Sequence, residues 1–248
     1  MKNILTKRIR QLVMSSLTVF ILCFVQGALA HTTLVPNVLD EGARVFASVS
    51  ISHGCDGTPV RAQAVVFPGS DGMVEEVGVG EDPNVATTFG DHLQGGLHSS
   101  ARLTQDKDVF RTQTQSELGG AAGFHFKNGY LQVDLTGQIP VRYSTPTFQA
   151  ASCAKKVDIL IPIANWCSKS ATAPDRVDVW MGRLTAKFND PTVQPVGFWP
   201  RITVHRDMAN NPLDAACGDG IDLEWSPTDA QIDELLPIEG YWPANAAP

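Results

Sequence analysis

A two-residue alternation of apolar and polar side chains limits, more than any other feature, how this chain can fold. It occurs at residues 45–51, 60–66, 131–135 and 177–181. Successive side chains of a β-strand point to opposite faces, so this alternation is typical of half-buried strands. Glycine and proline provide turn residues between such segments, for example Pro68-Gly69. The pattern predicts an all-β protein, a sandwich of the immunoglobulin-like kind.

One short helix is expected near the C-terminal end. Ser226 is a suitable N-cap, Pro227 fits the first helical position, and Asp229 completes a capping box. One apolar face and a terminating proline follow: Ile232, Leu235, Leu236 and Pro237. Residues 69–123 are weakly patterned and are predicted to form long loops around short strands. A soft boundary is expected near Asn165.

The first thirty residues have the three parts of a secretory signal peptide. Basic residues precede an apolar run from Leu12 to Val25, and Ala28-Leu29-Ala30 offers a small-x-small cleavage site. The run is too short and too interrupted by polar residues for a good membrane span, and no other segment approaches one. We therefore expect residues 1–30 to be removed, the mature chain to begin at His31, and the protein to be periplasmic or secreted.

The mature chain would be acidic and would hold an even number of cysteines. Cleavage removes four of the 19 basic residues and none of the 26 acidic ones, which leaves 218 residues with a net charge of about −11. Such a chain has no electrostatic reason to bind nucleic acid or an anionic membrane. An even number of cysteines in an exported chain predicts two disulfides, with three pairings open. The cysteines are Cys55, Cys153, Cys167 and Cys217, and since no pair has C-x-x-C spacing, a thiolate metal site is the less favoured alternative.

His31 is the residue that points most directly to chemistry, because cleavage would make it the N-terminus. Its α-amine and its ring Nδ1 could then chelate one metal ion, and nitrogen ligands of this kind suit copper. An α-amine has an ordinary pKa of about 8, so a metal displaces its proton at modest cost. The alternative is that signal peptidase cuts before an ordinary polar residue.

Several stretches together resemble a known family. The motifs are His31-Thr32-Thr33-Leu34-Val35-Pro36, then His53-Gly54-Cys55-Asp56-Gly57-Thr58-Pro59, then Phe67-Pro68-Gly69, and finally Phe148-Gln149-Ala150-Ala151-Ser152-Cys153 before Ile161-Pro162. Over residues 31–163 the chain resembles the YcnI-like (DUF1775) family of periplasmic copper-binding proteins, as a divergent member. Residues 164–248 lie outside this match and are expected to be a C-terminal β extension packed on the same domain.

The resemblance implies a cupredoxin-like β-sandwich in which His31 holds copper, helped by a carboxylate and a nearby tryptophan. The strand before Pro68 has Gln63 and no glutamate, and Trp166 lies just beyond the strand that follows the second family cysteine. The resemblance also implies two disulfides, Cys55–Cys153 and Cys167–Cys217.

The remaining candidate residues each have a functional and a structural interpretation. His53 is either a second imidazole ligand or a turn residue beside a disulfide. Asp219, Asp222 and Glu224 either surround a calcium ion or form a solvated turn, although their spacing is not that of a calcium loop. The five tryptophans fit core and edge positions best. The other histidines are scattered and fit structural roles best: His92, His98, His125 and His205.

Three functions follow, in order of preference. The first is a non-enzymatic copper-binding protein of copper homeostasis or delivery, with a copper ion as its ligand and a copper-trafficking protein as its partner. The second is a copper-dependent oxidative enzyme in which His31 and a distant histidine form a full histidine brace. The third is a structural or adhesive exported β domain in which His31 is incidental. Nucleotide-binding, hydrolase and zinc-protease motifs are absent from the sequence.

Overall fold

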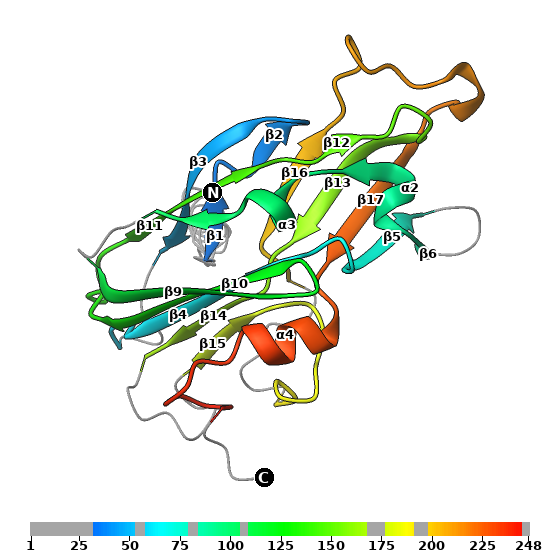
Figure 1. The fold of residues 1–248 in the computed structure, drawn as a ribbon. Coiled ribbons are helices and arrows are strands. Elements are labelled where there is room, and N and C mark those ends of the chain that lie inside the picture. The colour runs from blue at the N-terminus through cyan, green and yellow to red at the C-terminus, as the bar shows by residue number, and fades with distance from the viewer. Residues whose placement is uncertain are drawn as a thin grey trace, which may run out of the picture. The chain divides into compact units, whose positions relative to one another are not determined.

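The computed structural model (Figure 1) describes residues 32–52, 58–78, 84–104, 109–167, 177–190 and 198–244. Residues His31–Pro248 form one compact unit. Within the described ranges, its strands form sheets of four, five and six strands and one two-stranded sheet. The predicted all-β architecture is therefore confirmed.

The four-stranded sheet is antiparallel and has the order β1-β3-β11-β8. Its strands are β1 Thr33–Val35, β3 Arg44–Ile51, β11 Gly137–Ser144 and β8 Arg102–Leu103. The strand predicted at residues 45–51 is confirmed, because alternate residues of β3 from Val45 to Ile51 are buried and those between them face outward. The outward residues of β3 and β11 leave one face of this sheet open to solvent.

The five-stranded sheet is also antiparallel and has the order β15-β14-β4-β10-β9. Its strands are β15 Val177–Trp180, β14 Ile163–Trp166, β4 Ala62–Phe67, β10 Ala121–Gly129 and β9 Phe110–Leu118. The alternation at residues 60–66 predicts a half-buried strand, but every residue of β4 is buried. Both faces of β4 are covered, because Val65 and Phe67 join one core and Ala62 and Ala64 join another.

The six-stranded sheet is mixed and has the order β2-β16-β13-β17-β5-β6. Its strands are β2 Val38–Asp40, β16 Arg201–His205, β13 Ala154–Leu160, β17 Ile221–Ser226, β5 Met73–Val77 and β6 Asn84–Thr87. The pairs β2–β16 and β13–β17 are parallel, and the other pairs are antiparallel. The short elements are β7 Leu93–Gln94, β12 Thr147–Phe148, α2 Phe89–His92, α3 Leu97–Ser100 and the 3₁₀ turn η3 Ala215–Cys217.

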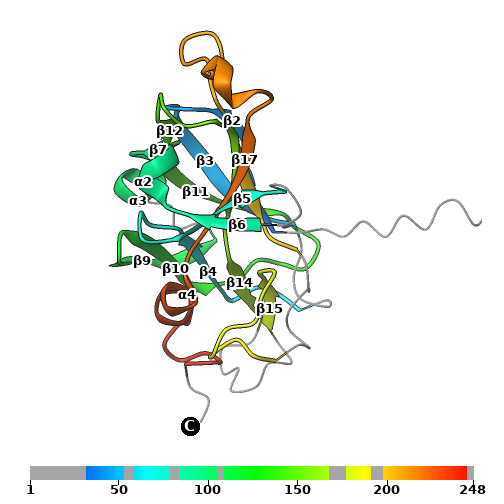
Figure 2. The same cartoon turned by 90° about the vertical axis from the view of Figure 1, so that its right-hand side faces the viewer.

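Two hydrophobic cores hold the sheets together. The main core takes buried side chains from all three large sheets, and within it the Phe67 ring packs against the rings of Phe124 and Tyr143 at tilted angles. The second core lies between the other face of the five-stranded sheet and the helix α4, Asp229–Leu235, with the segment that follows it. Figures 1 and 2 show the four- and six-stranded sheets on one side of the five-stranded sheet and α4 on the other. The predicted β-sandwich with a short C-terminal helix is confirmed.

Helix α4 begins two residues later than the sequence suggests. Its N-cap is Thr228, whose Oγ1 accepts the Gln231 N–H while Gln231 Oε1 accepts the Thr228 N–H. Ser226 is not the cap, because it is the last residue of β17 and its hydroxyl accepts a hydrogen bond from Arg183. The predicted buried face is confirmed: Ile232, Leu235 and Leu236.

Two other predictions of secondary structure are wrong. Residues 131–135 do not form a strand: Leu131 makes an isolated bridge to Val60, and the chain then turns, with Leu135 52% exposed. Residues 69–123 are not mainly loops, since they contain all of β9, which is nine residues long. Strand β9 lies at the edge of its sheet, so only Phe110 is buried and the hydrophobic alternation is missing.

Asn165 lies inside β14 and pairs with Gln63 of β4 and Asp178 of β15. Strands from before and after this residue therefore share one sheet, and β16 and β17 flank β13 in another. Residues 164–248 contribute strands to the interior of both sheets rather than lying on their surface.

Candidate functional site

The candidate copper site begins at His31, which lies outside the described residues, as do His53 and Cys55. The structure does describe the residue that follows it. Thr32 is 2% exposed, and its Oγ1 accepts a 2.8 Å hydrogen bond from Nδ2 of Asn165. Asn165 Oδ1 in turn accepts a 2.8 Å hydrogen bond from Nε2 of Gln63. This Thr32–Asn165–Gln63 chain ties the start of β1 to the middle of the five-stranded sheet.

Gln63 ends this chain with an unused acceptor. Its side chain is fully buried, and its Oε1 has no hydrogen-bond partner within the described part of the molecule. A buried carbonyl without a partner costs about 1–3 kcal/mol, so its oxygen is available to a donor group or an ion. Amide oxygen is a metal ligand, although it lacks the negative charge of a carboxylate.

Trp166, the tryptophan just beyond the strand that the family resemblance singles out, enters the second core. It follows Asn165 in β14, so its side chain points to the opposite face of the sheet. There it is buried in the second core, where its Nε1 donates a 2.6 Å hydrogen bond to the carbonyl of Trp242 and its ring packs on Tyr241. Trp166 is a core residue.

The structure joins a second set of polar residues that the sequence analysis did not connect. Nδ1 of His92 lies 2.8 Å from Ser152 Oγ, and Nε2 lies 3.0 Å from Thr87 Oγ1 and 3.4 Å from Glu76 Oε1. A serine, a histidine and a carboxylate in contact are the components of a hydrolase triad. These residues come from β5, β6, α2 and the approach to β13, and no sequence spacing relates them.

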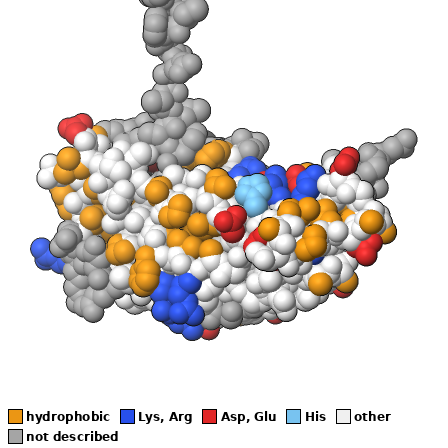
Figure 3. All heavy atoms as spheres, turned by 90° about the horizontal axis from the view of Figure 1, so that it is seen from above, with side chains coloured by type: hydrophobic (Ala, Val, Ile, Leu, Met, Phe, Trp, Pro, Cys, Tyr) orange, Lys and Arg blue, Asp and Glu red, His pale blue; other side chains and the backbone are white. Residues whose placement is uncertain are grey.

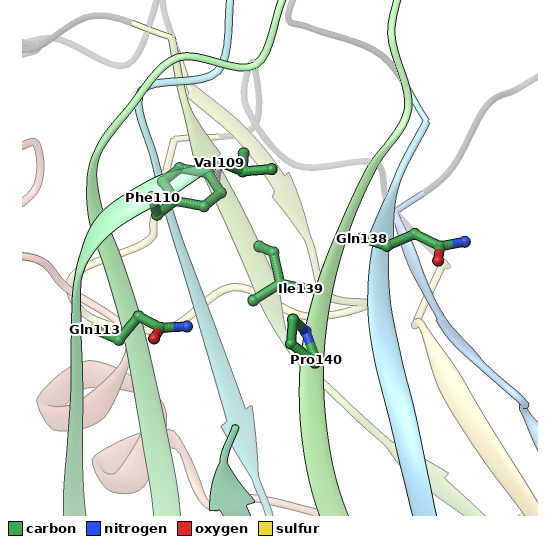
Figure 4. A pocket seen from close by; sticks show the side chains of 6 residues that line it. All are labelled: Val109, Phe110, Gln113, Gln138, Ile139 and Pro140. Carbon is green, nitrogen blue, oxygen red and sulfur yellow. The ribbon is translucent and has the colours of Figure 1, made fainter. Parts of the chain in front are cut away.

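Accessibility argues against a hydrolytic role for this serine. Ser152 is 4% exposed, and its Oγ also accepts a 3.0 Å hydrogen bond from the Ala154 N–H. The described part of the chain does have a small hollow, but it is lined by Val109, Phe110, Gln113, Gln138, Ile139 and Pro140 (Figure 4). Its volume of about 10 Å³ is enough for one water molecule, and none of its lining side chains is ionisable. The His92 cluster therefore holds β5, β6 and α2 against the start of β13.

The disulfides differ from those implied by the family resemblance. Cys153 is bonded to Cys217, with a Cα–Cα distance of 5.2 Å, so the pairings Cys55–Cys153 and Cys167–Cys217 are both wrong. The parallel pairing of β13 with β17 explains this, because Ala154 lies beside Ile221 and the Ile221 N–H bonds to the carbonyl of Cys153. Cys167 follows β14 in the other sheet and is itself disulfide-bonded, to a partner outside the described residues.

The other charged and histidine candidates have structural surroundings. Asp222 and Glu224 are not in a turn but on β17, where Asp222 lies 3.3 Å from Lys156 Nζ. Burial raises the pKa of Glu224, Arg201 partly offsets this effect, and the neighbouring carboxylates Asp158 and Glu75 raise the pKa further. Within the described ranges, no group of three histidine, cysteine, aspartate or glutamate residues could hold a metal.

His125 faces away from the main core that Phe124 and Phe126 enter. Its Nε2 donates a 2.6 Å hydrogen bond to the carbonyl of Leu235 on α4. His205 is exposed at the end of β16, and His98 lies on α3 with its side chain outside the description. Neither His125 nor His205 makes a hydrogen bond to Thr32, Asn165 or Gln63 in the described part of the structure.

Seen from above, as in Figure 3, the described surface has no single dominant charged region. Figure 3 shows hydrophobic side chains over this face and small separate groups of basic and acidic ones. None of the described helices is long and apolar enough to span a membrane.

Comparison with known proteins identifies no family. No protein-family model matches the chain, and no curated protein matches it. Among solved structures, the chain matches the sixth cohesin of scaffoldin B from Acetivibrio cellulolyticus, with 12% identity and a TM-score of 0.33 over 71% of this chain and 98% of the cohesin. Another is a non-cellulosomal cohesin from Archaeoglobus fulgidus, with 10% identity and a TM-score of 0.24 over 83% of this chain and 97% of the other. Scores this low carry no information on function.

Proposed function

We propose that this chain is an exported copper-binding protein of copper homeostasis or delivery, whose metal is held by the N-terminal His31. The observation that carries the proposal is the buried Thr32–Asn165–Gln63 chain, which fixes the residue next to His31 and ends in the unpartnered Gln63 Oε1. The Cys153–Cys217 disulfide supports export, because such bonds persist in oxidising compartments.

The chemistry follows from having two ligands in one residue. The α-amine and ring Nδ1 of His31 would close a compact chelate, and binding would order little additional chain. The Gln63 carbonyl would be a third, oxygen ligand, and acidic side chains elsewhere on the protein would offset the charge of the ion. Because the amine must lose its proton to bind, affinity should fall as the pH drops below about 8, the ordinary pKa of an α-amine.

Titration of the secreted, correctly processed protein with copper(II) tests the proposal. We expect one tight site per chain. Two variants should weaken it by at least about 100-fold: His31→Ala, which removes the ring, and a chain with one extra residue before His31, which displaces the α-amine. His205→Ala is the matched control, because it removes an exposed histidine at the end of β16 and should leave affinity unchanged.

A Gln63→Leu variant separates the buried oxygen from the chelate. It should weaken copper binding about tenfold while leaving the N-terminal chelate in place. Wild-type affinity in the extended chain would overturn the role of His31, and wild-type affinity in Gln63→Leu would remove only the third ligand. Absence of copper binding by the processed protein would favour the structural or adhesive β domain.

A further inference from the structure

The outer face of the four-stranded sheet is basic in an otherwise acidic protein. Arg44 and Phe46 point outward from β3, since Val45 and Ala47 between and beyond them are buried. Arg142 of β11 lies directly opposite Phe46, and Arg102 of β8 lies directly opposite Arg142. We call these four residues the basic face.

No carboxylate is built into this sheet. None of its four strands contains an aspartate or a glutamate. The nearest ion pair is a weak one, 4.0 Å from Arg102 Nη1 to Glu117 Oε1 of the neighbouring β9. Neither Arg44 nor Arg142 makes an ion pair or a side-chain hydrogen bond in the part of the chain that the structure describes.

The basic face also exposes apolar surface. Phe46 is 76% exposed, more than any other large hydrophobic side chain among the described residues. Val35 of β1 is 48% exposed, and Pro140 of β11 is half-buried on the same side, with Ser48 between them in register. Large exposed apolar side chains grouped with arginine are the composition of protein interaction hot spots.

The arrangement costs the isolated protein stability. Side chains directly opposite on neighbouring strands have Cβ atoms about 4.5–5.5 Å apart, and like charges at this separation are unfavourable. Arg102 and Arg142 form such a pair. A partner that brought carboxylates between these guanidinium groups and an apolar side chain onto Phe46 would relieve the repulsion and cover the ring.

We infer that the basic face is a docking surface for an acidic segment of a protein partner, one that presents carboxylates around an apolar side chain. A polyanion such as nucleic acid or a sulfated polysaccharide is the weaker fit. The basic face holds only three arginines, fewer than the about 6–10 phosphate contacts that a DNA-binding protein can make. The net negative charge of the whole chain also repels polyanions. The inference does not depend on copper.

A random peptide library displayed on phage tests this inference directly. The library is selected on the folded wild-type protein and counter-selected on a Phe46→Ser/Arg142→Glu variant, whose fold is checked by circular dichroism and thermal melting. We expect the enriched peptides to be rich in Asp and Glu around an aromatic or aliphatic residue. No enrichment over the variant, or enrichment of basic peptides, would overturn the inference.

Titration of one enriched synthetic peptide gives the second readout. Phe46→Ser and Arg142→Glu should each weaken its binding at least tenfold, and affinity should fall with added salt. Met208→Ser and Lys127→Glu are controls outside the basic face, since they also replace an apolar side chain by serine and a basic one by glutamate, and they should change affinity less than twofold. Equally tight binding of dextran sulfate at the same face would overturn the protein partner in favour of a polysaccharide.

Discussion

His125 should make the stability of this protein depend on pH. Burial lowers the pKa of His125 below 6.5, outweighing the Leu235 carbonyl that raises it, and Lys127 lowers it further. The unfolded chain therefore binds a proton that the folded chain resists, and the free energy of unfolding should fall as pH drops below about 6.5. His125→Gln keeps a donor for Leu235 but does not titrate, so it should reduce this fall by at most about 1.4 kcal/mol per pH unit.

Urea denaturation at pH 7 and pH 5.5 measures the effect. His205→Gln is the control, because it removes an exposed histidine and should leave the wild-type pH dependence in place. Identical pH dependence in His125→Gln and the wild type would contradict the assignment.

The hydrogen bonds between individual polar residues were the part of the site that the sequence predicted least well. The signal-like segment and the resemblance single out His31, but nothing local connects Thr32 with Asn165, which is 133 positions away. The same holds for His92 and Ser152, which lie 60 positions apart. Buried polar contacts of this kind depend on the register of strands from different sheets, and no periodicity in the chain encodes that register.

The start of α4 gives a prediction for an element. Thr228→Ala removes the acceptor for the Gln231 N–H and should lower the free energy of unfolding by about 1 kcal/mol. Thr228→Ser keeps the hydroxyl and is the matched control, with a change of less than half of this. Thermal or urea unfolding measures both variants. A larger loss in Thr228→Ser than in Thr228→Ala would show that packing of the methyl group, rather than the cap, matters.

Strands were predictable from the sequence where one face is buried and the other is exposed to solvent. Strands β3 and β15 meet this condition, and both were anticipated. Strand β9 lacks a buried face because it is exposed at a sheet edge, whereas β4 lacks an exposed face because it is buried on both sides. The alternation at residues 131–135 led to a wrong prediction. Strand β11 begins at Gly137, which leaves too few residues for a separate strand and the turn after it.

The two disulfides give a prediction for the whole molecule. Non-reducing peptide mapping should find Cys153 linked to Cys217 and no free Cys167. We propose Cys55 as the partner of Cys167, because Cys23 would leave with the signal peptide and the Arg61 N–H bonds to the carbonyl of Trp166, next to Cys167. A link between Cys55 and Cys153 would contradict this.

Replacing Cys153 and Cys217 together by alanine should cost stability without changing the fold. The two cysteines are 64 positions apart, and the loop-entropy estimate for such a bridge is about 4 kcal/mol. The pairing was not predictable from the sequence, since it depends on β17 lying parallel to β13, a neighbour more than 60 residues earlier in the chain.

The position of β17 within the six-stranded sheet also determines when that sheet can be completed. It lies between β13 and β5, so until residue 226 has been synthesised the six-stranded sheet is split into two parts that do not touch through hydrogen bonds. Strands β5 and β13 would each present an open edge to other chains during that interval. An incomplete chain of this kind is exposed to pairing with its neighbours until residues 221–226 join the sheet.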